Sequence, residues 1–343
     1  MNFATGRHRD AETRRKEKSP RLRVSASPRH KLKFGVGLIG FLIIALLAAI
    51  YFGSESLNFF ELTEAQNAIF FDVRLPRVLL GAAVGASLAV AGASLQSLLR
   101  NPLAEPYLLG VSNGAALGTM LAFVFFANIE FARPVFAILG AGLATVAVYQ
   151  MAKSRAGMNV ERLVLSGVIV TTFLSSILVL LTSLLDTTKL RSFTFWLLGD
   201  LSQATKNGFI LTGIAVVLGT ILLSSQARAL NLMMIGERDA FDFGVEVGRV
   251  RLIVFATASA LVGISVAASG SVGYVGLIVP HLIRLSIGSD NRAVIPFSAI
   301  AGAIFVIAAD TIARTAIAPR ELPVGAITAL IGAPMFIYLL RKS

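Results

Sequence analysis

The stretch "NPLAEPYLLGVSNGAALG", residues 101–118, interrupts a strongly apolar chain with an asparagine, two prolines and a glutamate. The segment before it, residues 75–98, is rich in glycine, alanine and serine and long enough to cross a bilayer. Small side chains let helix backbones approach closely in lipid, where hydrophobic burial cannot drive association. Because Pro102 and Pro106 lack the amide hydrogen that a continuing helix needs, the stretch predicts a turn between two membrane helices. The turn is either an ordinary connection or a constriction at the mouth of a pathway.

Composition extends this interpretation to the whole chain, since 55% of its 343 residues are hydrophobic, 15% are charged and the mean hydropathy is +0.77. This balance is typical of a chain solvated by lipid. We therefore expect an all-α polytopic membrane protein with about ten transmembrane helices of roughly 20 residues each. The expected segments are residues 34–53, 75–98, 107–126, 133–152, 160–183, 208–225, 249–269, 273–287, 295–316 and 323–341.

The amino terminus differs from the rest of the chain. Residues 1–33 contain 11 Lys/Arg against 3 Asp/Glu and no apolar period, which predicts a basic, disordered cytoplasmic tail before a transmembrane domain over 34–343. A nucleic-acid-binding arm is disfavoured because aromatic stacking residues are nearly absent. With the tail inside, the expected inner side carries 23 of the 31 Lys/Arg, so the positive-inside rule places both termini in the cytoplasm.

Residues 226–248 form the most polar connection between expected spans. The sequence "GERDAFDFGVEVG" surrounds Phe241, Phe243 and Val245 with charged residues. This pattern favours a pair of short amphipathic helices whose apolar ridge fits a groove on a partner subunit. A plain solvated loop is the alternative.

Several classes of site are excluded or weakly supported. Without cysteine there are no disulfides or thiolate metal sites, and the three scattered histidines form no imidazole cluster. No catalytic constellation has a suitable helical spacing, so we expect neither a metal site nor an enzyme. Asp310 is the main charge within a span, which keeps an ion-coupled secondary transporter as the alternative function.

A weak internal repeat accompanies these features. A shift of 178 residues aligns Gly92 with Gly270, Pro102 with Pro280, Gly110 with Gly288, and Asn113 with Asn291. Because the shift covers five expected spans, the two copies would be inverted in the membrane. Chance matches in a chain with 30 glycines are the alternative.

Seven motifs occur in one order along the chain. They are "RLPR" (74–77), "NPLAEPYLLGVSNGAALG" (101–118), "FWLLGDLS" (195–202), "LNLMMIGERDAFDFGV" (230–245), "GSVGYVGLIVPHLIRL" (270–285), "ADTIAR" (309–314) and "ELPVGAITALIGAPMFIYLL" (321–340). Together they resemble the FecCD-type permeases that import iron–siderophore complexes, haem and cobalamin through bacterial ATP-driven transporters. The resemblance covers roughly residues 60–341. It implies a multi-pass protein of the bacterial cytoplasmic (inner) membrane that works by alternating access.

The resemblance assigns roles to residues near the span ends. It implies that Arg74, Arg77 and Arg314 dock a substrate-binding protein by pairing with its glutamates. The alternatives are interfacial snorkelling or a local pair, such as Asp310 with Arg314. It also implies that Asn101 and Leu103 form a cytoplasmic gate, with helix capping by Asn101 as the alternative.

The resemblance also implies the partners. ATPase coupling would use Gly236, Glu237, Arg238, Asp239 and Ala240. No GxxxxGK[ST] motif occurs in the sequence, so two separate ATP-binding subunits would hold ATP and Mg, and this chain would carry no cofactor. A second permease copy and membrane lipid complete the expected partners, with no nucleic acid. Ferric siderophore, haem and cobalamin are the implied substrates, ferric siderophore first as the commonest.

Overall fold

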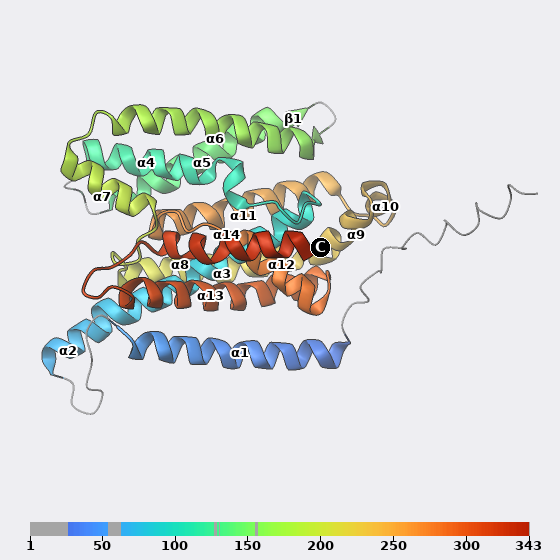
Figure 1. The fold of residues 1–343 in the computed structure, drawn as a ribbon. Coiled ribbons are helices and arrows are strands. Elements are labelled where there is room, and N and C mark those ends of the chain that lie inside the picture. Colours follow the sequence, from blue (N-terminus) through green and yellow to red (C-terminus); the bar gives the residue numbers. More distant parts are fainter. Residues whose placement is uncertain (1–26, 54–62, 127–128, 130, 155–156, 343) are drawn as a thin grey trace, which may run out of the picture.

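The computed structural model describes residues 27–53, 63–126, 129, 131–154 and 157–342, which are almost entirely helical (Figure 1). A π-helical segment (Ile69–Arg74) joins α2 (Glu64–Ala68) to α3 (Leu75–Leu98), and a 3₁₀ helix (Pro106–Leu109) precedes α4 (Val111–Phe125). Strands β1 (Lys153–Ser154) and β2 (Gly157–Met158) pair antiparallel. The helices are α1 (Pro28–Tyr51), α2 (Glu64–Ala68), α3 (Leu75–Leu98), α4 (Val111–Phe125), α5 (Ala132–Ala152), α6 (Val160–Thr182), α7 (Thr187–Leu197), α8 (Lys206–Ser225), α9 (Ala227–Ile235), α10 (Glu237–Asp242), α11 (Val247–Ser269), α12 (Val275–Ile287), α13 (Asn291–Thr315) and α14 (Val324–Lys342).

Ten helices coincide, within a few residues, with the ten apolar segments expected from the sequence. Among the described residues, seven are long and apolar enough to cross a membrane, the second of them as the continuous helix Glu64–Leu98. The other three are the shorter α4, α12 and α14. The 13 residues of α12 span about 20 Å, less than a bilayer's hydrocarbon core. A multi-pass membrane fold follows, while ten crossings and the orientation of the termini stay predictions.

The basic tail lies mostly outside the described residues, which begin at residue 27. Residues 28–33, expected to be disordered, instead form the first turns of α1. Ser27 caps this helix by accepting a hydrogen bond from the amide of His30, and Pro28 occupies its first turn. The helix therefore begins ahead of the apolar segment because capping residues, not hydropathy, set its start.

Helices α1 and α3 have similar hydropathy but opposite environments. In the most apolar stretch of the helix Glu64–Leu98, which contains α3, 83% of the residues are buried inside the protein. In the most apolar stretch of α1, only 11% are buried. Figure 1 shows α1 along one flank, while α3 runs through the interior. A Cβ at Gly85 of α3 would overlap the carbonyl of Gly302 in α13, and the reverse holds for Gly302. The small residues of α3 thus allow the backbone contact that makes it the central helix.

Two irregular segments meet inside the bundle, one before α4 and one before α12. The Tyr107 hydroxyl donates to the carbonyl of Val272 at 2.9 Å and accepts from its amide at 3.0 Å. From α3, the Gln96 amide group donates to the carbonyls of Gly276 at 3.2 Å and Leu277 at 3.0 Å. Non-helical backbone inside a bundle is tolerated when protein satisfies its polar groups, as the Tyr107 hydroxyl does for Val272. Gln96 in turn bonds to carbonyls in the first turn of α12.

Candidate functional site

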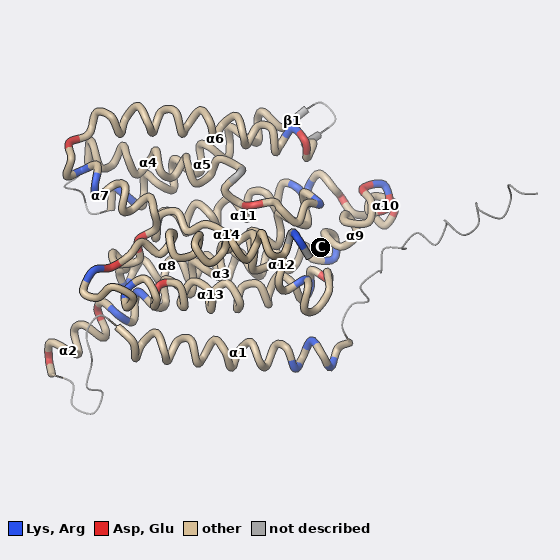
Figure 2. Tube along the Cα trace, viewed as in Figure 1, with Lys and Arg blue, Asp and Glu red and all other residues tan. Residues whose placement is uncertain are grey.

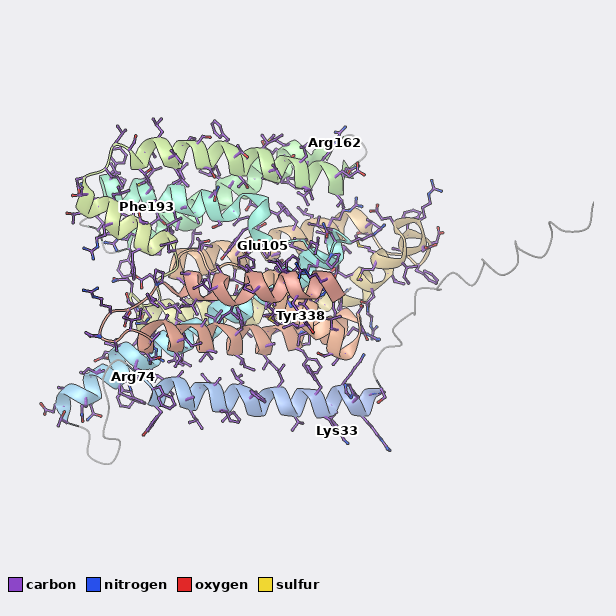
Figure 3. All side chains as sticks on the ribbon, viewed as in Figure 1. Lys33, Arg74, Glu105, Arg162, Phe193 and Tyr338 are labelled. Atoms are coloured by element: carbon purple, nitrogen blue, oxygen red, sulfur yellow. The ribbon has the colours of Figure 1, made fainter. Side chains whose placement is uncertain are left out.

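The predicted site residues lie at opposite ends of the helix bundle, where the charged residues gather (Figure 2). The described start of α1, the end of α14 and the pair α9–α10 share one end (Figure 1), which we call the inner end after the predicted orientation. Figure 3 places Lys33 and Arg162 toward this end and Arg74 at the other, the outer end. A candidate coupling surface and a candidate docking surface are therefore separated by the length of the helices.

At the inner end, α9 and α10 form the pair of short helices expected from residues 226–248. Gly236 joins them in an extended conformation, and Gly244, with a φ of 81°, reverses the chain before α11. Ala240 and Met233 face the protein and are 0% and 1% exposed. Ile235, Phe241 and Phe243 are at least 72% exposed, and we call these three residues the ridge. Large apolar side chains exposed within a short polar segment are typical of a surface for a partner.

The residues predicted for ATPase coupling divide by exposure. Arg238 and Asp239 are exposed, Gly236 and Glu237 are partly buried, and Ala240 is buried. Only the exposed and partly exposed members can touch a partner directly. The buried Ala240 instead fixes α10 against the rest of the chain. Their role in coupling stays a prediction.

The predicted gate residues lie in a tight turn after α3. The amide of Arg100 bonds to the carbonyl of Ser97 at 3.3 Å and that of Asn101 to Gln96 at 3.1 Å, which is a Schellman motif. The Asn101 Oδ1 then accepts from the amide of Leu103 at 2.8 Å. The Asn101 side chain thus stabilises the turn and does not cap the start of a helix. Both Asn101 and Leu103 are exposed, and their action as a gate stays a prediction.

At the outer end, the three predicted docking arginines are buried. Arg74, Arg77 and Arg314 are 5%, 6% and 3% exposed. Arg77 donates from Nε and Nη2 to Asp310 Oδ1, at 3.0 and 2.9 Å, and from Nη1 to both carboxylate oxygens of Glu321 at 2.9 Å. Arg314 lies 3.2 Å from Asp310 Oδ2. The local pair of Asp310 with Arg314, considered from the sequence as an alternative, is therefore present.

Two of these arginines also donate hydrogen bonds to carbonyls at the carboxyl end of α1. Arg74 donates to the carbonyl of Ile50 at 3.0 Å, and Arg314 donates to the carbonyl of Ala49. Cations are stabilised at a helix carboxyl terminus, where carbonyls lack partners within the helix. In this arrangement the three guanidinium groups cross-link α1, α3 and α13 and do not face a partner. Docking of a binding protein through them stays a prediction and would require these contacts to open.

Comparison with known proteins decides the family. The model of the family described as "FecCD transport family" matches residues 41–342.

The chain belongs to the FecCD transport family.

The resemblance drawn from its sequence motifs is therefore confirmed. This FecCD chain is 38% identical over 319 residues to the hemin transport system permease protein HmuU of Yersinia pestis, covering 89% of this chain and 95% of the relative. It is 40% identical over 303 residues to the cobalamin import system permease protein BtuC of Halobacterium salinarum, covering 88% and 78%. It is also similar to a solved ABC transporter described as being of metal-chelate type and inward-facing, with 34% identity and a TM-score of 0.83. That match covers 91% of this chain and 100% of the other.

The FecCD chain also contains polar contacts that sequence reasoning missed. Arg284 of α12 reaches the Ser97 hydroxyl at 2.7 Å and Asn291 Oδ1 at 3.1 Å. Asn231 of α9 bonds to Asp290 at 2.8 Å and to the amide of Asn291 at 2.9 Å. The cation within "PHLIRL" was the available signal, because a charge inside an apolar segment needs partners. The network links the inner ends of α3, α9, α12 and α13.

Two carboxyl groups between helices have local partners. Glu105 accepts from the amide of Tyr274 at 3.2 Å, so this side chain is not simply solvated as expected for a surface turn. Asp290 caps α13 and is partly buried. Its desolvation is outweighed by hydrogen bonds from Arg292 and Asn231, which hold its pKa well below its usual range.

Proposed function

We propose that the chain is the membrane-spanning permease of an ATP-driven importer that carries a bulky metal chelate into the cytoplasm. Ferric siderophore is our first candidate, with haem and cobalamin next. The relatives' names support this class, since one transports hemin and another imports cobalamin. The observation that carries the proposal is the exposed ridge of α9–α10 at the inner end, on a chain with no nucleotide-binding motif of its own.

Two ATP-binding subunits, which hold ATP and Mg, would contact the permease at this ridge and transmit the movement driven by ATP hydrolysis. Ile235, Phe241 and Phe243 would fill a groove on each subunit, with Glu237, Arg238 and Asp239 around the ridge. Aromatic anchors of this kind contribute most of the free energy at protein interfaces. Gly236 and Gly244 flank α10, so this short helix could change its angle to α9 and α11, as a coupling element requires.

Substrate would enter from the outer end, delivered by a binding protein to a pathway between two copies of the chain. The exposed Asn101 and Leu103 of each copy would meet across the two-fold axis and close the inner side by packing. ATP binding and hydrolysis would alternate the pathway between outward-open and inward-open states. No covalent chemistry takes place in this chain.

The ion-coupled alternative requires Asp310 to bind and release a cation. Asp310 is 2% exposed and already contacts Arg77 and Arg314, whose guanidinium groups stay protonated in proteins. A carboxylate paired in this way is suited to holding helices together. The ATP-driven importer is therefore the better-supported function.

The test is uptake in cells that lack the gene, with the neighbouring ATPase and binding protein present. Labelled ferric siderophore, haem and cobalamin are supplied separately, and we expect loss of one uptake that the wild-type gene restores. A Glu237→Ala/Arg238→Ala variant should fail to restore it. The control is Glu246→Ala/Arg249→Ala, which removes the same charges from an exposed ion pair in the same region and should restore uptake. Unchanged uptake of all three substrates in the deletion, or uptake without an ATPase, would contradict the proposal.

A further inference from the structure

Glu237 connects the coupling pair to the predicted gate turn. Its carboxylate lies 3.4 Å from the guanidinium of Arg100, the residue that precedes Asn101. The same oxygen also pairs with Arg251 of α11. The Arg251 side chain is only 12% exposed, whereas those of Arg100 and Glu237 are 39% and 42% exposed. Arg251 is thus the most buried member of this cluster, and Arg100 and Glu237 are its two partly exposed members.

The backbone of Arg100 gives an independent reason to assign it a role. Its φ is 49°, the left-handed conformation at the end of the α3 Schellman motif. Glycine is the favoured residue at this position because a Cβ is strained there. Terminating α3 does not require an arginine. A strained backbone at a predicted functional turn is better explained by what its side chain contacts, which is the first residue of α10.

The turn can transmit a displacement of Arg100 because it is internally bonded. Asn101 Oδ1 holds the amide of Leu103 at 2.8 Å, and the Asn101 carbonyl holds the amide of Ala104 at 3.1 Å. These bonds tie residues 101–104 into one turn directly after Arg100. Leu103 is 44% exposed at the tip of this unit, where a shift changes what it covers.

We propose that the Arg100–Glu237 ion pair is the link through which movement of α10 repositions the gate turn. This inference rests on the proposed function, since it takes α9–α10 as the contact with the ATPase. Arg100 is a positioning residue and touches neither nucleotide nor substrate. Displacement of α10 by the ATPase subunit would move Glu237 between Arg251 and Arg100 and so tighten or release the turn. Direct packing of α9 against α3 is the competing route for the same movement.

The decisive variant is Arg100→Gly, which removes the side chain and suits the left-handed backbone, so the fold is kept. It is measured in the complete complex of permease, ATPase and binding protein in proteoliposomes. We expect substrate transported per ATP hydrolysed to fall about two- to fivefold, the range for a partly exposed ion pair. Arg100→Lys, which keeps the charge, should recover most of the ratio. Arg249→Gln, which breaks the exposed pair with Glu246 at the start of α11, should leave it unchanged.

A second readout does not depend on transport. The chain contains no cysteine, so Leu103→Cys introduces a unique thiol in it at the gate turn. Its labelling rate by a membrane-impermeant maleimide should differ between the nucleotide-free and ATP-plus-vanadate states, and Arg100→Gly should abolish that difference. If the Arg100→Gly variant keeps both the wild-type ratio and the difference, the link is wrong and the packing of α9 on α3 carries the movement. If the wild-type complex transports none of the three substrates, the proposed function fails, and the labelling still decides the link.

Discussion

Two charge clusters at opposite ends of the bundle, Arg77–Asp310–Arg314 and Arg100–Glu237, differ in their exposure to solvent. At the outer end, Arg77, Asp310 and Arg314 are nearly inaccessible and satisfy one another across α3 and α13. At the inner end, the side chains of Arg100 and Glu237 are about 40% exposed. The ridge residues of α9–α10 are exposed as well. A buried network fixes helices, because breaking it leaves an unpaired charge in a low dielectric. A half-exposed pair exchanges partners at little cost, as a moving part requires.

The largest effect should come from breaking the outer network. Asp310→Ala leaves two buried guanidinium groups without their shared carboxylate, so we expect a loss of about 3–5 kcal/mol in the free energy of unfolding. Thermal unfolding in detergent measures it. The comparison variant at the inner end is Glu246→Ala, whose ion pair is 74% exposed on both sides and should shift stability by no more than about 0.5 kcal/mol. Equal shifts in the two variants would contradict the contrast between the ends.

The inner ridge should show the reverse behaviour, with binding affected and stability unchanged. Phe241→Ala removes a side chain that is 72% exposed, so the fold loses little. Affinity for the ATPase subunits should fall about 10- to 100-fold, the range for an aromatic interface anchor, as measured by titration in detergent. Phe41→Ala on the flank of α1, at 66% exposure, is the matched control and should bind normally. A ridge variant with wild-type affinity would remove the basis of the coupling surface.

A smaller effect should come from the accessible part of the outer network. Glu321 bonds to Arg77 but its side chain is 32% exposed, and Arg77 retains Asp310 when Glu321 is neutralised. Glu321→Gln should therefore cost about 1 kcal/mol or less, well below the cost of Asp310→Ala, in the same unfolding experiment. A loss as large as that of Asp310→Ala would mean that the network is held from the loop instead of from α13.

The smallest effect concerns acidity at the inner end. Because the folded pKa of Asp290 lies below its usual value, its ionised form stabilises the fold above the unfolded pKa of about 3.9. That contribution is lost as the pH falls through the folded pKa. Asp290→Asn should therefore be less stable than wild type at neutral pH, and the difference should shrink on acidification below about pH 4. A difference that does not change with pH would mean that ionisation of Asp290 is not what stabilises the fold, since Asn caps a helix as well as Asp.

Sequence patterns predicted the helices well because breakers and caps are local. Pro102 follows the end of α3, Pro106 begins the 3₁₀ helix before α4, and the apolar segments agree with the structure within a few residues. The small residues of α3 also predicted a helix that other backbones approach closely, and the structure shows such contacts. Hydropathy alone could not separate α3 from α1, since lipid and protein interior favour the same side chains.

The candidate sites were harder to predict because their contacts join residues far apart in the chain. Arg77 meets Asp310 and Glu321, and Arg100 meets Glu237, only after the helices pack. From sequence alone, an arginine at the end of a span is expected to be exposed. In the structure, however, Arg74, Arg77 and Arg314 are buried. The ridge was predictable, since Phe241 and Phe243 stand among charges within one short loop.

The most direct test of the account is uptake of a labelled ferric siderophore by proteoliposomes that contain the permease and its ATPase, with the binding protein added outside. ATP is placed either inside or outside the vesicles, and the permease orientation is fixed by assaying accessibility of a single cysteine on α10. We predict accumulation only when ATP is on the α9–α10 side, unaffected by a proton ionophore. Haem and cobalamin are run in parallel. Accumulation driven by an ion gradient without ATP would contradict the account and make Asp310 the residue to pursue.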